Sequence, residues 1–233
     1  MVDISNIVKR MRHLEHFKGL SPSELMEIVR AGQIRHCSAG TTIYRENDSC
    51  SGLYVLFRGQ VHLYKLGPEG QENIISIIKP VIMFNEVAVL DGGPNPLTAV
   101  TFKDSMIWRI TSETFNYGMQ RYPKIAMGLL PVLASRTRWL ISQYEDLSFL
   151  SVRDRTAKLL LELSDNGRQP INRRDYTIYE MAARVATVPE AISRSLSFYR
   201  DLRVIESSRT TIIITKPDEL AQVKQVDSDF EIV

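Results

Sequence analysis

The sequence predicts an α+β fold in three consecutive parts: an antiparallel β-sandwich or roll, a long helix, and a helical hairpin followed by a β-hairpin. Three observations lead to this prediction. From residue 34 onward, apolar and polar residues alternate in short runs. After Pro123 the apolar period lengthens to about three and a half residues, and beyond residue 152 helical patterns precede a short β pattern.

The composition is that of an ordinary globular protein. Of its 233 residues, 44% are hydrophobic and 24% charged. It lacks an uninterrupted apolar run of about 18 residues, and charges interrupt the amino end where a secretory signal would be apolar. We therefore expect a cytoplasmic chain without a membrane partner. Its two cysteines, Cys37 and Cys50, are too few to hold an iron–sulfur cluster by four thiolates, so we interpret them as buried or idle thiols.

The first segment begins with two short helical patterns. Residues 21–24 (SPSE) supply a hydroxyl cap, a proline at the first helical position and an acid in the first turn of the second helix. The strand-like runs that follow are residues 41–44, 52–56, 61–64 and 74–78. Turn-forming residues separate them, among them residues 46–49 and 58–60. Short strands at this spacing are typical of an antiparallel sandwich or roll.

The long helix carries apolar residues at alternating spacings of four and three, which is a heptad seam. The seam consists of Ala126, Leu130, Leu133, Thr137, Leu140, Tyr144 and Leu147. Pro131 is expected to kink or loosen the first turn. From the pattern alone, the seam is buried either against its own domain or against a twin helix.

The third segment begins with a helix over residues 155–163, closed by Asn166 and Gly167. Two further helices, 178–186 and 189–202, are joined through Thr187 and Val188, which is a helix-turn-helix candidate. Strand patterns at 204–206 and 211–215 flank residues 207–209, as in the wing of a winged helix. A generic helical hairpin followed by a β-hairpin is the alternative. The net charge of +2 is too small to indicate a nucleic-acid partner by itself, although residues 151–216 are basic.

Three segments, in register along nearly the whole chain, resemble the CRP/FNR (catabolite activator / fumarate-nitrate regulator) family of bacterial transcription factors. Residues 39–48 (AGTTIYREND), with 52–56 and 59–61, resemble its opening β-roll. Residues 84–93 (FNEVAVLDGG) resemble the phosphate-binding turn of its ligand pocket, and residues 180–194 resemble its DNA-reading motif. The resemblance implies a cyclic-nucleotide-binding-like jelly roll over 1–122, a dimerisation helix over 123–151 and a winged helix-turn-helix over 152–233.

The family's geometry also implies that the seam lies against its twin in a parallel dimer. The two recognition helices would then be about one DNA turn apart and match a palindromic operator in double-stranded DNA. RNA polymerase is the further partner that the resemblance implies. The expected interface residues are Leu130, Leu133, Thr137, Leu140, Tyr144 and Leu147.

In the DNA-reading motif, Pro189 is expected at the first position of the recognition helix. The resemblance places Glu190 and Arg194 in the major groove, where Glu accepts from cytosine and Arg reaches guanine or a phosphate. A surface i,i+4 ion pair is the alternative. Candidate phosphate contacts are Ser193, Thr177, Arg184 and wing Arg209.

This sequence also departs from the family's DNA-reading motif. Val188-Pro189-Glu190 stands where the family commonly has Ser-Arg-Glu, so we expect a different operator. Ala186 replaces the turn glycine, which is tolerable only if its φ is negative.

The expected effector pocket comprises Asn85, Glu86, Val87, Asn95, Leu97, Thr98, Leu140 and Ile141. The family's cyclic-nucleotide binders have a glycine where Asn85 stands, and an arginine that neutralises the phosphate. Residues 94–99 (PNPLTA) contain no cation, and Leu140 and Ile141 replace adenine-facing hydroxyls. Cyclic AMP is therefore not the expected effector, and no motif in the sequence identifies another one.

Haem is a candidate in this family, with His13, His16, His36 or His62 as ligand, although surface or strand histidines are the favoured interpretation. We predict no metal site, and no catalytic residues because the sequence lacks a Gly-x-Ser-x-Gly turn and a Gly-rich phosphate loop. The competing hypotheses are a β-roll protein that binds haem or another small molecule with weak DNA binding, and an enzyme.

Overall fold

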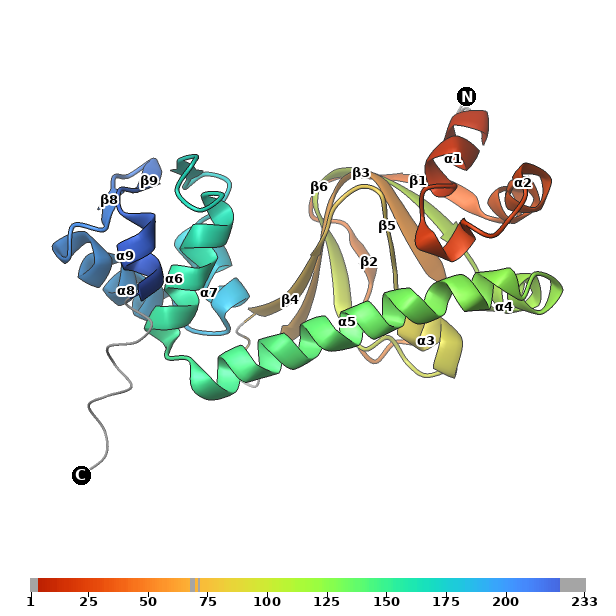
Figure 1. Ribbon diagram of the computed structural model, residues 1–233. Coiled ribbons are helices and arrows are strands. Elements are labelled where there is room, and N and C mark those ends of the chain that lie inside the picture. Colours follow the sequence, from red (N-terminus) through yellow and green to blue (C-terminus); the bar gives the residue numbers. More distant parts are fainter. Residues whose placement is uncertain (1–3, 68–69, 71, 223–233) are drawn as a thin grey trace. The chain divides into compact units, whose positions relative to one another are not determined.

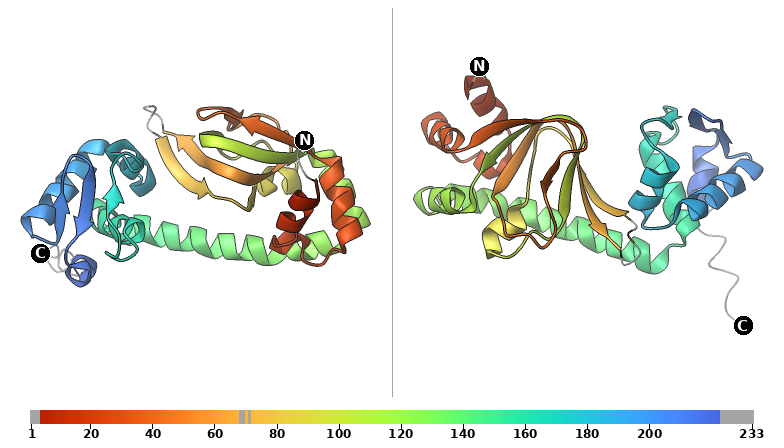
Figure 2. Two further views of the ribbon diagram at one scale, coloured as in Figure 1. Left: turned by 90° about the horizontal axis from the view of Figure 1, so that it is seen from above. Right: turned by 180° about the vertical axis from the view of Figure 1, so that it is seen from behind.

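The computed structural model describes residues 4–67, 70 and 72–222. The chain forms two compact units, one containing residues 1–65 and 75–139 and the other residues 66–74 and 140–233. The outermost parts of the predicted first and last domains, 1–3 and 223–233, lie outside the described residues. Because one long helix passes from the first unit into the second, the three-part division at 122 and 151 stays a proposal. Figures 1 and 2 show the described elements.

The first unit begins with helix α1 (Ile4–Met11), a 3₁₀ turn η1 (Glu15–Phe17) and helix α2 (Pro22–Ala31). The predicted cap of α2 is confirmed as a capping box, in which the Ser21 hydroxyl accepts from the Glu24 amide and the Glu24 carboxylate accepts from the Ser21 amide. Apolar residues of this segment, including Met11, Phe17 and Leu25, enter the core beneath the sheet.

An antiparallel sheet forms the predicted β-roll. Its strands are β1 (Gln33–Cys37), β2 (Thr42–Tyr44), β3 (Leu53–Leu66), β4 (Glu72–Ile78), β5 (Ile82–Phe84) and β6 (Thr98–Ile110). Their order is β1-β6-β3-β4, with β2 paired to β6 and β5 to β3. Figure 1 shows the long strands β3 and β6 at the centre of the roll.

The predicted turn at residues 58–60 is wrong. Strand β3 continues through it from Leu53 to Leu66, and the pairing with β6 shifts register around Arg58 and Gln60, as in a β-bulge. Gly59 has a φ of 96°, and a Cβ there would lie 2.5 Å from the Asp104 carbonyl oxygen. The glycine that resembled a turn therefore permits a close approach of two backbones within one long strand.

Three helices complete the sensor side: α3 (Glu86–Asp91), α4 (Ser112–Arg121) and α5 (Lys124–Phe149). Helix α5 is continuous through Pro131. Its buried residues Ile125 and Leu129 join the core of the roll. Gly128 allows η1 to pack on the helix, because a Cβ there would lie 2.7 Å from the Glu15 carbonyl oxygen. The face of α5 that packs on its own domain is thus not the predicted seam.

The second unit has its own core. Its further elements are α6 (Val152–Leu163), β7 (Ile171–Asn172), α7 (Ile178–Val185), α8 (Pro189–Asp201), β8 (Ile205–Ser207), β9 (Thr211–Ile214) and α9 (Pro217–Gln222). Strands β7, β9 and β8 form a small antiparallel sheet, and β8 and β9 are the predicted wing hairpin. Leu160, Met181, Ile192 and Ile212 meet in the core beneath it. Among the helices that the structure describes, none is both long and apolar enough to span a bilayer.

Candidate functional site

Helices α7 and α8 form the helix-turn-helix. The turn begins at Ala186, whose φ of 55° lies in the left-handed region, and the Thr187 amide donates to the Ala182 carbonyl over 3.0 Å. The expected negative φ at Ala186 is therefore wrong: the helix ends in a left-handed cap, which an alanine adopts against a steric preference. Val188 is extended, as a residue before proline should be, and Pro189 starts α8 as predicted.

Helix α8 separates a buried face from an exposed face. Ile192 is fully buried and Leu196 is 6% exposed, so the prediction that both turn inward is confirmed. Glu190, Ser193 and Arg194 are exposed. No ion pair joins Glu190 and Arg194 in the described part of the chain, and their reading of bases stays a prediction.

The other predicted DNA contacts lie in different surroundings. The Thr177 hydroxyl caps α7 by accepting from the Glu180 amide. Arg184 pairs with Glu162 at 2.8 Å and its side chain is only 14% exposed, so it ties α7 to α6. Arg209 is exposed in the wing turn between β8 and β9.

The predicted interface residues of α5 are uncovered to different degrees. Leu133 is half-buried and Thr137 is exposed. The exposed fractions of the four larger side chains are 58% for Leu130, 52% for Leu140, 72% for Tyr144 and 50% for Leu147. The seam therefore does not pack against the protein's own core. Of the two alternatives that the pattern left open, this excludes burial of the seam against its own domain.

On the sensor side, Asn85 and Asn95 close the turn that precedes α3. Asn85 has a φ of 73°, a conformation that asparagine tolerates better than most residues and that explains its place in a glycine position. Its side-chain amide donates to the Gly52 carbonyl and to the Asn95 side-chain oxygen, both over 3.0 Å. Asn95 is fully buried and in turn donates to the Arg45 carbonyl. Two amide side chains thus fill the turn.

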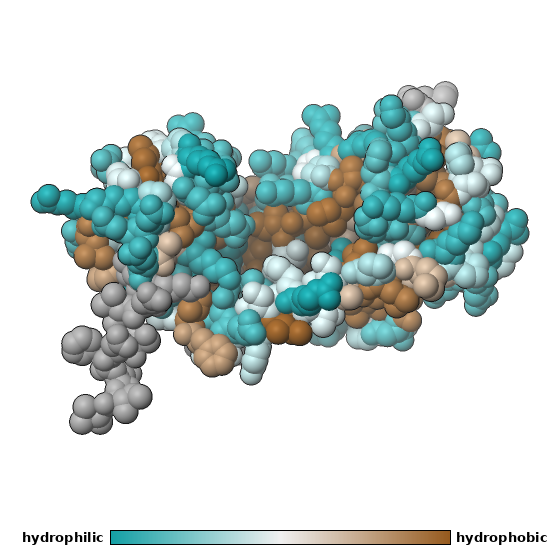
Figure 3. Space-filling view, viewed as in Figure 1, coloured by the Kyte–Doolittle hydropathy of each residue, from teal (hydrophilic) through white to brown (hydrophobic). Residues whose placement is uncertain are grey.

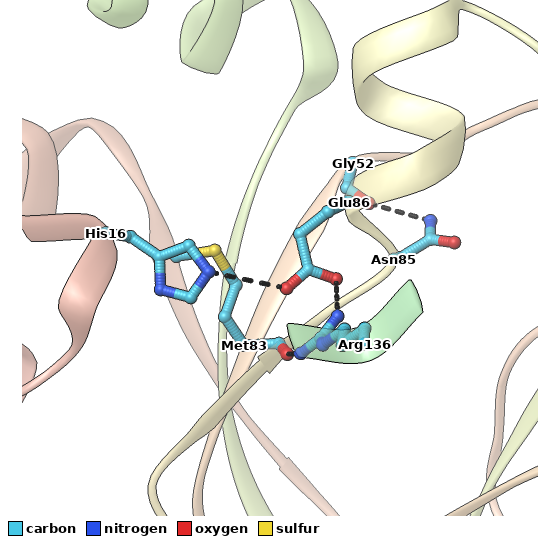
Figure 4. Close-up of polar contacts among 6 residues, drawn as sticks. All are labelled: His16, Gly52, Met83, Asn85, Glu86 and Arg136. Atoms are coloured by element: carbon cyan, nitrogen blue, oxygen red, sulfur yellow. Dashed lines mark hydrogen bonds and ion pairs between the residues drawn. The ribbon is translucent and has the colours of Figure 1, made fainter. Parts of the chain in front are cut away.

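Glu86, the first residue of α3, is 2% exposed and lies between two partners (Figure 4). The Arg136 guanidinium, from α5, donates to Glu86 Oε2 over 2.6 Å and to the Met83 carbonyl over 2.7 Å. On the other side, His16 Nε2 lies 3.6 Å from Glu86 Oε1. The interpretation of the histidines as surface or strand residues is wrong for His16, which is 4% exposed within η1.

The remaining residues of the predicted pocket do not converge on Glu86. Val87 is 52% exposed, Leu97 packs on the apolar cluster inside the roll, and the Thr98 hydroxyl accepts from the Glu46 amide. Leu140 and Ile141 are about half exposed on α5, at 52% and 54%.

Aromatic rings lie beside this polar group instead. The rings of Tyr44, Tyr54 and Phe84 have centroids 5.3–6.3 Å apart. Burial raises the pKa of the Tyr44 phenol well above its usual value, and the nearby Tyr54 and Glu86 raise it further. The interior of the roll around Glu86 is therefore aromatic and closely packed.

Sequence reasoning missed His16 and Arg136 as partners of Glu86. For Arg136 a signal existed: it lies seven residues after Leu129 and eleven after Ile125, on the helix face that packs against the roll. A cation at a core-facing helical position implies a buried acid nearby. No comparable local pattern marked His16.

The positions of the histidines bear on a haem site. His13 and His36 are exposed, whereas the His62 ring stacks on Phe102 with centroids 4.4 Å apart and bonds to Gln60. Within the described residues, no cluster of three or more His, Cys, Asp or Glu side chains could hold a metal ion. Because a single histidine can hold haem iron, the lack of such a cluster does not test the haem candidate, and His16 faces Glu86.

Together, the roll, the long helix and the winged helix-turn-helix define a class of protein: a sensor domain joined to a DNA-binding domain, as in one-chain transcriptional regulators. Comparison with family models agrees in both parts. Residues 34–122 match the cyclic nucleotide-binding domain, and residues 154–223 match the Crp-like helix-turn-helix domain.

Curated relatives match along most of the chain. The CRP-like cAMP-activated global transcriptional regulator of Mycobacterium tuberculosis is 27% identical over 88% of this chain and 94% of that protein. The cyclic AMP receptor protein of Thermus thermophilus is 28% identical over 89% of this chain and 95% of that protein. The crystal structure of the Thermus thermophilus catabolite activator protein superposes with a TM-score of 0.54 at 27% identity, covering 90% and 99% of the two chains.

The chain belongs to the CRP/FNR family of transcriptional regulators. It is a regulator with a helix-turn-helix DNA-binding domain.

Proposed function

We propose that this protein is a homodimeric transcription factor that recognises a palindromic operator through helix α8 of each protomer, in response to an effector other than cyclic AMP. The observation that carries the proposal is the division of α8 into two faces. Ile192 and Leu196 hold the helix in its domain, while Glu190 and Arg194 project from the exposed face, four residues apart. Side chains at this spacing can read adjacent base pairs in the major groove.

Contacts to the DNA backbone would position α8. Arg209 in the wing and Thr177 at the start of α7 are exposed and available for phosphate contacts, whereas the exposed Ser193 hydroxyl on α8 would first have to release the Pro189 carbonyl. Arg184 would first have to release Glu162, so we expect it to contribute less than Arg209. Pro189 contributes by starting the helix without an unused amide donor.

The uncovered seam on α5 supports a dimer. Figure 3 shows hydrophobic side chains on the surface where α5 runs, interrupted by hydrophilic ones. A second copy of the helix would cover Leu130, Leu133, Leu140, Tyr144 and Leu147 at once, with Thr137 between them. A two-fold dimer presents two copies of α8, as a palindromic operator requires.

The sensor turn disfavours a cyclic nucleotide. A phosphate at this turn would meet the Asn85 and Asn95 amides rather than an arginine from residues 94–99, and a buried phosphate needs a charge-assisted partner. Arg136, the cation beside Glu86, is already bonded to that carboxylate and to the Met83 carbonyl. The names of the two relatives make cyclic AMP the competing effector.

Two measurements test the effector. Titration calorimetry of the full chain with cyclic AMP should show no binding, and micromolar binding would overturn this part of the proposal. An absorption spectrum and native mass analysis of the purified protein then identify any molecule that co-purifies. A Soret band would establish haem and contradict our interpretation of the histidines.

DNA binding is tested by retention of duplexes from a random pool on the immobilised protein. The proposal expects enrichment of a palindromic sequence, whereas a β-roll small-molecule binder with weak DNA binding would retain no preferred sequence. We propose RNA polymerase as a further partner, so the enriched site placed near a promoter should change transcript yield in transcription with the purified polymerase.

A further inference from the structure

The first turn of α6 contacts helices α7 and α8 and the residue that follows α5, all within the second unit. The Arg155 guanidinium donates from Nη1 to the Leu150 carbonyl over 3.1 Å and from Nε to the Val185 carbonyl over 3.2 Å. The neighbouring Arg153 carbonyl accepts from the Tyr199 hydroxyl over 2.7 Å. The Arg153 guanidinium also lies 3.9 Å from the centre of the Phe198 ring. Tyr199 and Phe198 belong to the recognition helix α8.

The two carbonyls that Arg155 holds occupy special positions. Leu150 directly follows the last residue of α5, and Val185 is the last residue of α7, immediately before the turn into α8. Carbonyls at helix C-termini lack partners within their own helix and attract cations. The planar fork of an arginine can reach two such groups at once, which a lysine cannot do with the same geometry. One side chain therefore joins the end of α5 to the entrance of α8.

Other contacts in this region are weaker or more local. Lys158 pairs with Asp146 of α5, but the lysine side chain is 47% exposed, and exposed pairs contribute little. The hydrogen bonds of the capping box join Ser151 and Asp154 to each other and fix the start of α6. Beside the apolar core that α6 shares with α7 and α8, Arg155 is the side chain that bonds both to the residue after α5 and to the last residue of α7.

The same unit carries part of the proposed dimer seam. Leu140, Tyr144 and Leu147 lie on the stretch of α5 that belongs to the second unit, together with α8. If two copies pair along this stretch, the orientation of α8 relative to the end of α5 determines the distance and angle between the two recognition helices. Each added base pair rotates the second half-site by about 36° around the DNA axis, given about 10 base pairs per turn.

We propose that Arg155 is a positioning residue for operator binding: by holding the Leu150 and Val185 carbonyls together, it sets the half-site spacing that the dimer accepts. This inference rests on the proposed function, because it needs a dimer on a palindromic operator. It predicts that loss of Arg155 relaxes spacing preference without changing how α8 reads a half-site.

The test is fluorescence anisotropy with the full chain at fixed salt, on four duplexes: the selected operator, the operator with one base pair inserted between half-sites, the operator with one deleted, and a single half-site. The proteins are wild type, Arg155→Gln, Arg155→Lys and the control Arg168→Gln. Arg168 is an exposed residue of the same unit whose side chain is 76% exposed. Its replacement removes the same charge without touching the two carbonyls.

For wild type and Arg168→Gln we expect weaker binding to both altered spacings. In Arg155→Gln this spacing penalty should shrink about tenfold, the factor that corresponds to one charged hydrogen bond, while half-site affinity stays within about a factor of two. The spacing penalty of Arg155→Lys should lie between those of wild type and Arg155→Gln. This variant serves as the test if Arg155→Gln fails to fold.

An unchanged spacing penalty in both Arg155 variants would overturn the inference. Equal weakening on all four duplexes, half-site included, would also overturn it, since that is the result of a merely structural role. Wild-type protein that binds every spacing equally would overturn the proposed palindrome recognition as well, and the wild-type titrations alone identify that case.

Discussion

The substitution Leu140→Asp tests the proposed dimer at the middle of the seam. Leu140 is 52% exposed, so a partner helix would cover about half of the side chain. Full burial of a leucine contributes about 1.5–3 kcal/mol, so the covered half contributes about 1 kcal/mol, and two-fold symmetry counts it twice. An aspartate at the same place adds a desolvation cost of at least about 1 kcal/mol for each chain.

These contributions sum to about 4 kcal/mol for the dimer, which corresponds to a dissociation constant raised by about a thousandfold. Sedimentation velocity over a range of protein concentrations measures the shift, with circular dichroism to establish that the variant is folded. The control is Leu202→Asp, at a residue that is 45% exposed at the end of α8 and outside the seam. If Leu140→Asp remains as dimeric as wild type, the reasoning about this interface is refuted.

Three further predictions concern stability. Ala186→Gly should raise the free energy of unfolding by about 1 kcal/mol, because the φ of 55° strains an alanine but not a glycine; a lower urea midpoint would contradict this. Arg136→Met should lower the free energy of unfolding by about 1–3 kcal/mol, because it leaves the Glu86 carboxylate buried beside His16 alone. Adding Glu86→Gln should recover part of this loss in thermal melts, whereas strictly additive losses would argue against the Glu86–Arg136 pair. Thr177→Ala should remove the cap of α7 and lower stability by about 1 kcal/mol, while Thr177→Ser should match wild type in the same melts.

The sequence predicted those parts of the fold that depend on local patterns. The cap at Ser21, the start of α8 at Pro189 and the inward turn of Ile192 and Leu196 follow from helix-end chemistry and a 3.6-residue period, and each is confirmed. The prediction of a turn at residues 58–60 was wrong because a glycine has the same local sequence pattern in a turn and in a β-bulge. Only the pairing of β3 with β6 distinguishes the two.

The sensor interior was less predictable, because its contacts join distant segments. Glu86 meets Arg136, fifty residues later, and His16, which comes from the N-terminal segment. The sequence identified Glu86 by its motif but carried no rule that pairs it with a cation on α5. The left-handed φ of Ala186 opposes the local steric preference of alanine, and the glycine that the family has at this turn was the signal for it.

The central claim is that α8 reads the operator through Glu190 and Arg194. Its most direct test is operator selection from a random duplex pool, at fixed salt, with wild type, Glu190→Ala, Arg194→Ala and Arg209→Ala. Loss of a base contact should relax the preference at one operator position in each half-site, with a loss of about 1–3 kcal/mol there. Arg209→Ala should weaken all sequences alike and return the wild-type consensus. If Glu190→Ala and Arg194→Ala also return that consensus unchanged, the claim is contradicted.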